Sequence, residues 1–177
     1  MLINYRQLKI SDAEKIRVWR NKQLKILRQN EIIKKKDQEK YFKNFILSKK
    51  FKLELFAIEY NQKLIGYGGL VNISNYFKTA EVSFLLNDKV NHNSKFYEKT
   101  FINFLIFVKK HSKKKKLRKL YTETFSFRKK HIKILENCGF KLEGIMKKHI
   151  IKNKKIYDSF MHGMLNKKDR KKILSKK

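Results

Sequence analysis

Hydrophobic and polar residues along the chain repeat with two different periods, which predict strands and helices in a defined order. Residues 5–10 alternate as a strand does, and Ser11 with Glu14 has the spacing of a capping box at the start of a helix that ends near Asn21. Further hydrophobic stripes, with residues three and four positions apart, predict helices over residues 37–48, 95–110 and 128–138. Gly139 supplies the left-handed residue that commonly follows a helix.

Strand-like runs occupy most of the remaining chain, over residues 53–59, 63–73, 80–86, 117–125, 142–151 and 156–165. The turn-prone pairs Asn61–Gln62 and Asn153–Lys154 separate neighbouring runs, which predicts antiparallel connections. The run Lys113–Lys116 is predicted to be a solvated loop. The resulting order is β-α-α-β-β-β-α-β-α-β-β. It predicts one α/β (α+β) domain over residues 1–165, followed by a basic tail over residues 166–177 that we expect to be disordered.

Composition restricts the class of protein. Hydrophobic residues make up 41% of the chain and aromatic residues 13%, which is too many for a disordered basic segment and predicts a packed core. A single cysteine excludes an internal disulfide, and the five histidines never pair at the spacing of metal ligands. No segment approaches the roughly 18 uncharged residues of a membrane span, and the first residues lack the order of a signal peptide. We therefore expect a cytoplasmic protein with no metal site and no membrane span.

The chain is strongly basic, with 46 Lys and Arg against 15 Asp and Glu and a net charge of +31. Such a charge attracts phosphates, so nucleic-acid binding is one interpretation. The excess is mainly lysine and is scattered along the chain, as A/T-biased codons would produce without selection for a partner. Nucleic acid is therefore not expected to be the main partner. We instead expect the positive charge to attract phosphorylated small molecules to the protein.

Two stretches carry a resemblance to a known family. Residues 81–86, before a loop and a long helix, and residues 134–144, with Leu135-Glu136, Gly139-Phe140 and Glu143-Gly144, resemble a GNAT-type N-acetyltransferase. The resemblance covers residues 2–165. The second stretch is similar to the ribosomal-protein alanine acetyltransferases. Residues 16–21 are similar to the acetyltransferases of nucleotide-linked amino sugars in surface-glycan pathways, pseudaminic acid synthesis included, and this branch is preferred.

The family resemblance implies a mixed, mostly antiparallel central sheet that is flanked by helices and splayed between its fourth and fifth strands. It implies acetyl-CoA as the acetyl donor, direct attack by a substrate amine on the thioester, and a monomer or homodimer. An ammonium group with a pKa of about 10 must lose its proton before it attacks, so the site needs a base. The developing oxyanion needs a donor, which in this family is a backbone N–H of the fourth strand.

Three residues are candidates for the catalytic proton transfers. Glu81, on the fourth strand, is the first choice for the base, and Glu123, on the facing strand, is the second. Leu135 occupies the position where family members commonly have a Tyr that acts as the acid and protonates the departing thiolate. The ribosomal-protein branch usually has Ser where this chain has His131, and His131 is the candidate acid. A structural role stays open for each of these residues.

The loop after the fourth strand departs from the family pattern. The usual glycines fall near His92, Ser94 and Phe96, and no glycine is present. Either the loop takes another path and the start of the following helix holds the phosphates of the cofactor, or cofactor binding is weak. We favour a retained phosphate site. The predicted cofactor-binding residues are Val82, Phe84, Leu86, Ser94, Lys95, Phe96 and Arg128. The resemblance and the glycines at positions 66, 68 and 69 also predict a bulge or a close backbone approach.

Residues at the two ends of the chain are candidates for holding the acceptor. They are Trp19, Arg20, Asn21, Asp158 and His162. A core tryptophan, a surface arginine and a hairpin carboxylate are the structural alternatives. The predicted reaction is acetyl transfer to a primary amine, preferably on a nucleotide-linked amino sugar. The alternatives are a protein N-terminal acetyltransferase and a catalytically silent GNAT fold that serves as a basic binding module for RNA or another anionic partner.

Overall fold

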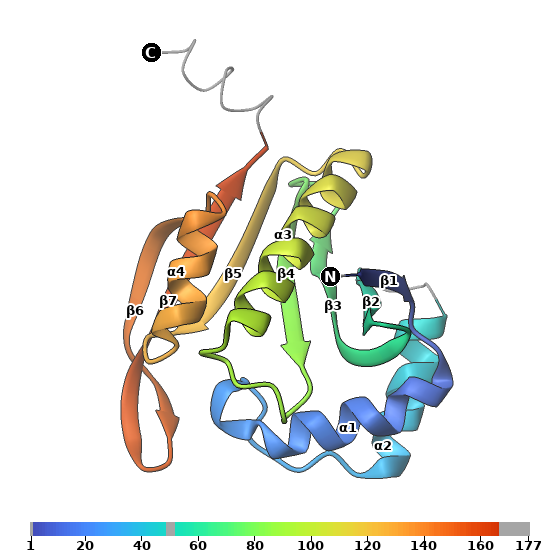
Figure 1. The fold of residues 1–177 in the computed structure, drawn as a ribbon. Coiled ribbons are helices and arrows are strands. Elements are labelled where there is room, and N and C mark those ends of the chain that lie inside the picture. Colours follow the sequence, from blue (N-terminus) through green and yellow to red (C-terminus); the bar gives the residue numbers. More distant parts are fainter. Residues whose placement is uncertain (1, 49–51, 167–177) are drawn as a thin grey trace. The chain divides into compact units, whose positions relative to one another are not determined.

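The computed structural model describes residues 2–48 and 52–166, and the chain divides into two compact units (Figure 1). The first unit comprises Met1–Val71 with Ser83–Thr100, and the second comprises Asn72–Val82 with Phe101–Lys177. Strands β3 and β4 and helix α3 each contribute residues to both units.

The elements follow the predicted order. The strands are β1 (Ile3–Gln7), β2 (Glu54–Tyr60), β3 (Lys63–Ser74), β4 (Thr79–Leu86), β5 (Lys119–Phe125), β6 (Lys141–Lys152) and β7 (Lys155–Leu165). The helices are α1 (Ala13–Lys22), α2 (Lys35–Tyr41), α3 (Lys95–Lys114) and α4 (Lys129–Asn137), with short 3-10 turns at Ile10–Asp12 and Leu24–Ile26. Within the described residues the hydrogen-bonded strand order is β1-β2-β3-β4-β5-β7-β6.

The sheet is mixed, as predicted. Strand pairs β1·β2, β2·β3, β5·β7 and β6·β7 are antiparallel, whereas β4 and β5 are parallel. The parallel pairing joins Thr79–Glu81 to Lys119–Tyr121. The predicted turns are also present: Asn61 and Gln62 have φ of 47° and 62°, and Asn153 and Lys154 have 51° and 61°. Two consecutive positive φ angles are typical of two-residue hairpin turns.

The core of the first unit lies where α1 and the π-helical turn Phe42–Leu47 pack on β2 and β3. Its buried members are Leu8, Ala13, Ile16, Phe42, Ala57, Tyr67 and Leu85. We predicted one regular helix over residues 37–48. Instead α2 begins at Lys35 and changes to the wider π-helix from Phe42. This change lets the side chain of Phe42 reach the core, where it is 1% exposed.

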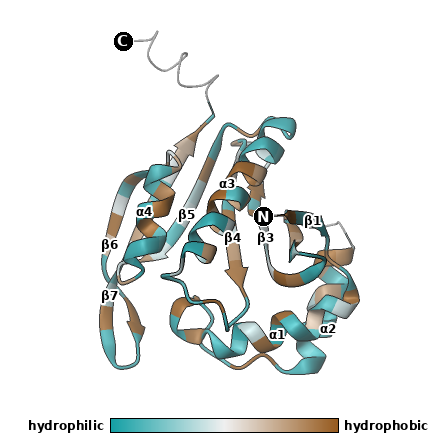
Figure 2. Ribbon diagram, in the orientation of Figure 1, coloured by the Kyte–Doolittle hydropathy of each residue, from teal (hydrophilic) through white to brown (hydrophobic). Residues whose placement is uncertain are grey.

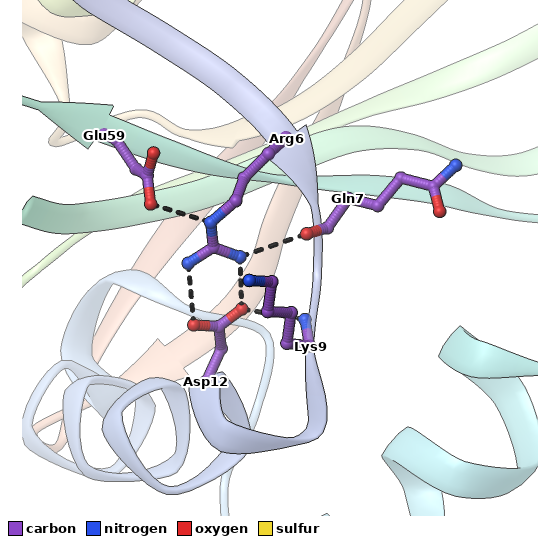
Figure 3. Close-up of polar contacts among 5 residues, drawn as sticks. All are labelled: Arg6, Gln7, Lys9, Asp12 and Glu59. Atoms are coloured by element: carbon purple, nitrogen blue, oxygen red, sulfur yellow. Dashed lines mark hydrogen bonds and ion pairs between the residues drawn. The ribbon is translucent and has the colours of Figure 1, made fainter. Parts of the chain in front are cut away.

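A polar network, not the predicted capping box, holds the start of α1 (Figure 3). The side chain of Glu14 binds Arg17, and Asp12 accepts a hydrogen bond of 2.8 Å from the backbone N–H of Lys9. Arg6 donates to both carboxylate oxygens of Asp12, at 2.7 and 3.0 Å, and to Glu59 at 2.7 Å. The network therefore ties β1, the turn before α1 and β2 together.

Two predicted boundaries in the second unit are wrong. Helix α3 continues past residue 110, so Lys113 and Lys114 belong to it. The buried face of the helix, which includes Val108, extends to the buried Ser112. Asn166, assigned to the tail, is buried. Its backbone N–H donates to Arg118 and its side-chain amide donates to Leu117 at 2.5 Å. The predicted disorder of residues 167–177 lies outside the described residues.

Gly66 is needed for the close approach of β3 to β4, as the sequence predicted. A Cβ atom at Gly66 would lie 2.5 Å from the carbonyl oxygen of Leu85 and 2.6 Å from Cδ2 of Leu86. We expect Gly66→Ala to lower the free energy of unfolding by about 1–3 kcal/mol, because the strands must separate. Gly144→Ala is the matched control, since nothing lies within 4 Å of its Cβ position. Urea unfolding measures both variants, and equal stabilities would contradict the packing argument.

Candidate active site

A cavity of about 430 Å³ opens within the first unit, between the helices and the sheet. Its lining residues are Ile16, Arg20, Ile33, Asp37, Gln38, Tyr41, Phe42, Ile46, Leu55, Tyr67, Val71 and Ser83. The lining is mostly aromatic and aliphatic, with one arginine and one carboxylate. Such a mixture is typical of a pocket for an organic ligand with a few polar groups. The cavity is therefore the candidate acceptor site.

Arg20 is held in place at this cavity. Its Nη1 donates a hydrogen bond of 2.7 Å to the hydroxyl of Tyr67, and its Nε donates one of 2.9 Å to Oε1 of Gln29. Burial, with a smaller contribution from Tyr67, raises the pKa of Tyr41, so its hydroxyl stays protonated at neutral pH. A positioned guanidinium beside tyrosine hydroxyls can bind a phosphate or carboxylate.

The other two acceptor candidates on α1 have structural contacts. Trp19 packs against the core of the first unit. Asn21 donates to the carbonyl of Ile33 at 2.9 Å and accepts from its backbone N–H at 2.9 Å, which fixes the segment between α1 and α2. Neither residue lines the cavity, whereas Arg20 does. The contact of Trp19 is that of the structural alternative, a core tryptophan.

The second half of β4 has one backbone edge directed away from β3. The N–H of Asn87 donates to the carbonyl of Ile65 in β3, so the alternating positions Leu86 and Phe84 direct their backbone groups to the opposite side. The carbonyl of Leu86 there accepts a hydrogen bond of 2.9 Å from the buried amide of Gln23. Gln23 therefore anchors the end of β4 to the end of α1, a role that no sequence pattern indicated.

The glycine-free loop after β4 is built from asparagine turns. Oδ1 of Asn87 accepts from the N–H of Lys89 at 3.0 Å, and Oδ1 of Asn91 accepts from the N–H of Asn93 at 2.8 Å. Asparagine side chains mimic a backbone turn in this way. The ring of His92 stacks on that of Tyr97 with centroids 4.7 Å apart. The rings of Phe96 and Tyr60 form a T-shaped pair with centroids 5.3 Å apart.

The start of α3 fits an anionic group. Ser94 caps the helix: its Oγ accepts from the N–H of Tyr97 at 3.1 Å and its carbonyl accepts from Glu98 at 3.2 Å. The backbone N–H groups of Lys95 and Phe96 have no hydrogen-bond partner in the described part of the chain. Exposed N–H groups at a helix N-terminus bind phosphates, and the exposed Lys95 adds a positive charge.

Glu81 is a buried carboxylate in the second unit. It is 4% exposed, and its Oε2 accepts a hydrogen bond of 2.8 Å from Nδ2 of Asn72. Asn72 has a left-handed φ of 50°, a conformation that asparagine tolerates better than most residues. A structural role for Glu81 stays open.

Glu123 shares a sheet face with Glu81. Glu81 is paired with Tyr121, and Glu123 follows Tyr121 by two positions on β5. Paired residues and residues two apart lie on the same face. Oε1 of Glu123 accepts a short hydrogen bond of 2.5 Å from Oγ of Ser159. Both predicted base candidates therefore lie on one face of the second unit.

Asp158 and His162 lie on the opposite face. His162 is paired with Thr122, which alternates with Glu123. The side chain of His162 is fully buried, 3.7 Å from Glu136 of α4, and Asp158 accepts a hydrogen bond from the N–H of Lys148. Strand alternation thus separates these two residues from both carboxylates. Their predicted roles in substrate binding stay predictions.

Arg128 and His131 lie together at the start of α4. Nη2 of Arg128 is 3.4 Å from Nδ1 of His131, and the imidazole stacks on Phe101 with centroids 4.2 Å apart. His131 is buried and in contact with α3, and its predicted role as the acid stays a prediction. Over residues 2–48 and 52–166, no group of three His, Cys, Asp or Glu side chains could hold a metal ion. No helix in this part is long and apolar enough to cross a membrane.

Comparison with known proteins decides the family. The family described as an acetyltransferase (GNAT) domain matches residues 5–161. The chain belongs to the GNAT acetyltransferase family. No curated protein matches it. The family match identifies the chain as an acetyl-CoA-dependent N-acetyltransferase.

Solved structures share the GNAT fold of this acetyltransferase. The spermidine N-acetyltransferase from Vibrio cholerae in complex with CoA and spermine has a TM-score of 0.81 and 20% identity, covering 94% of this chain and 96% of that one. Mutant forms of the spermidine/spermine N-acetyltransferase from the same organism have a TM-score of 0.78 and 23% identity, covering 96% and 97%. A dodecameric structure of the Vibrio cholerae enzyme in an intermediate state has a TM-score of 0.76 and 19% identity, covering 94% and 95%.

These comparisons support the broad family prediction and leave the narrower ones as predictions. None of these three solved structures is a ribosomal-protein acetyltransferase or an amino-sugar acetyltransferase. Sequence reasoning also missed most of the cavity. Asp37 and Tyr41 come from α2, Tyr67 from β3 and Ser83 from β4, and they carry no motif, so no local signal marked them.

Proposed function

We propose that this N-acetyltransferase acetylates the primary amine of an anionic acceptor, and that the acceptor is a nucleotide-linked amino sugar. The observation that carries the proposal is Arg20, which Tyr67 and Gln29 hold at the wall of the cavity. A fixed guanidinium suits a diphosphate, whereas it repels a second ammonium group. The net charge of +31 acts in the same sense over longer distances.

Charge argues against a polyamine acceptor, although the structures that share the fold include spermidine N-acetyltransferases. A polyamine site needs several carboxylates to compensate its charges. Asp37 is the single carboxylate among the described residues that line the cavity. It can hold one hydroxyl or ammonium group of an acceptor that also carries phosphate.

The residues of the chain support a direct transfer. Acetyl-CoA supplies the acetyl group as a thioester. Lys95, Phe96 and the N-terminus of α3 would hold its phosphates, because their N–H groups remain available. Backbone groups of Phe84 and Leu86, directed away from β3, are the donors that β4 offers to a carbonyl oxygen. Glu81 would take the proton from the substrate ammonium.

A competition between acceptors tests the proposal. We expect kcat/KM for a nucleoside-diphosphate-linked amino sugar to exceed that for spermidine and for a peptide N-terminus by at least about tenfold. Arg20→Gln should raise KM for the nucleotide sugar by about tenfold or more and leave kcat within about twofold, because a charge-assisted contact is lost in ground and transition states alike.

Lys22→Gln is the matched control for Arg20→Gln. Lys22 lies on the same helix, carries the same charge and pairs with Asp88 at 3.2 Å outside the cavity. It should leave KM nearly unchanged. Preference for spermidine, or an equal rise in KM in both variants, would refute the anionic acceptor. Preference for the peptide would instead support the protein N-terminal alternative.

A further inference from the structure

The second unit carries a dense cluster of positive charge at the end of α3. Residues 109–119 contain eight Lys and Arg and no Asp or Glu. Lys113–Lys116 and Arg118 are exposed, and Figure 2 shows the last turn of α3 as hydrophilic. Leu117, the one aliphatic residue of this stretch, is buried with 4% exposed. The stretch therefore presents charge with almost no apolar surface of its own.

An exposed aromatic pair lies beside this cluster. Tyr76 and Phe77, in the turn between β3 and β4, are 87% and 64% exposed, and their rings meet at 84° with centroids 4.9 Å apart. Backbone hydrogen bonds hold the turn next to the cluster: the carbonyl of Lys78 accepts from the N–H groups of Arg118 and Lys119, at 2.6 and 3.2 Å. Figure 1 shows this turn next to the end of α3.

The charge of the cluster is largely uncompensated. Lys119 is paired with Glu143 at 2.5 Å. Within residues 2–48 and 52–166, no ion pair joins Lys113, Lys114, Lys116 or Arg118 to a carboxylate. Uncompensated lysines hold mobile counterions, whose release favours the binding of a chain of phosphates.

We propose that this surface, made of Tyr76, Phe77, Lys113–Lys116 and Arg118, binds a single-stranded polynucleotide. Its two features are those of sequence-tolerant single-strand binding, in which cations follow the phosphates and open aromatic rings stack on bases. A bilayer is a poorer fit, because insertion needs a wider apolar face than two adjacent rings. All the residues of this surface belong to the second unit, and the proposal is independent of the acceptor of the acetyl group.

Fluorescence anisotropy of the full chain with a labelled single-stranded 20-nucleotide RNA, and with DNA of the same sequence, tests this surface. Replacing Lys113, Lys114 and Lys116 together by Gln should weaken binding and reduce the slope of log K against log salt by about 2, because each contact to a single strand contributes about 0.7. Tyr76→Ala with Phe77→Ala should weaken binding by about tenfold at unchanged salt slope, through lost stacking.

The matched control removes three charges elsewhere. Lys34, Lys35 and Lys36 are exposed residues of the first unit, and their replacement by Gln changes the net charge equally. This control variant should weaken RNA binding much less than the replacement of Lys113, Lys114 and Lys116. Equal weakening by both triple variants would show attraction by net charge alone and overturn the proposal. So would an unchanged affinity in the aromatic variant, or tighter binding to phosphatidylserine vesicles than to RNA. The acetylation rate of each variant verifies that it is folded.

Discussion

Replacing Glu81 by glutamine is expected to lower kcat by about 100-fold or more at pH 7, with little change in the affinity for acetyl-CoA. Glutamine keeps the size of the side chain, and its carbonyl oxygen can still accept the hydrogen bond from Asn72. It cannot take a proton from the substrate ammonium. Initial rates with saturating acetyl-CoA measure the loss, and melting temperatures show that the variant is folded.

The pH dependence separates a lost base from a distorted site. The free amine of the acceptor becomes abundant as the pH approaches its pKa of about 10. A base is then no longer needed, so the ratio of the wild-type rate to the Glu81→Gln rate should shrink as the pH rises from about 7 to about 10. A distorted site would give a ratio that does not change with pH.

Glu123→Gln is the control on the same sheet face. Glu123 accepts a hydrogen bond from Ser159 and is the second candidate. We expect its replacement to cost less than tenfold in kcat and to show no recovery at high pH. A large, pH-dependent loss in Glu123→Gln with an unaltered rate in Glu81→Gln would transfer the role of base to Glu123.

Asp12→Ala is expected to lower the free energy of unfolding by about 3 kcal/mol at pH 7. Only 6% of the Asp12 side chain is exposed, and its removal takes from Arg6 one of its two carboxylate partners and leaves the N–H of Lys9 without its acceptor. Burial alone would raise the pKa of Asp12. The hydrogen bonds from Arg6 and Lys9 and the charge of Arg6 outweigh burial, so the pKa of Asp12 is lowered from its ordinary value.

A lowered pKa in the folded state determines the sign of the pH effect. The contribution of Asp12 is complete above its unfolded pKa of about 4 and is lost as the pH falls through the lower folded value. The stability difference between the wild type and Asp12→Asn should therefore shrink in acid. Urea unfolding at pH values from about 7 to about 3 measures it.

Glu14→Gln is the matched control for this network. Glu14 pairs with Arg17 on the exposed side of α1. Exposed pairs contribute little to stability, so the variant should unfold at nearly the wild-type urea concentration. A loss of stability in Glu14→Gln as large as in Asp12→Ala would mean that helix charge, and not the Arg6 network, supports this end of α1.

Much of the fold could be predicted because its signals are local. Alternation over residues 80–86 and the hydrophobic stripe of α3 each reflect contacts that recur within a few residues. Errors arose where a contact outside the periodic pattern decided the local structure. The carboxylate of Asp12 bonds Arg6 and Lys9, so the helix does not use Ser11 and Glu14 as a capping box. The amide of Asn166 finds the carbonyl of Leu117, 49 residues away in sequence.

The candidate site was predicted less completely than the fold. Arg20 was named from its place on α1, but the residues that hold it, Tyr67 and Gln29, were not, since Tyr67 is 47 residues away. Asp158 and His162 were named from a correct alternation along β7. The alternation could not show that α4, through Glu136, packs on their face.

The amino-acid sequence by itself determined the order of strands and helices, the family and the positive charge, because periodicity, turn residues and composition are properties of short segments. Tertiary structure alone decided which side chains meet. It placed Arg20 against Tyr67 in a cavity, Glu81 against Asn72, and two exposed aromatic rings beside a cluster of lysines. Contacts of this kind join residues far apart in the chain, and their formation depends on how strands pair and which face each helix covers.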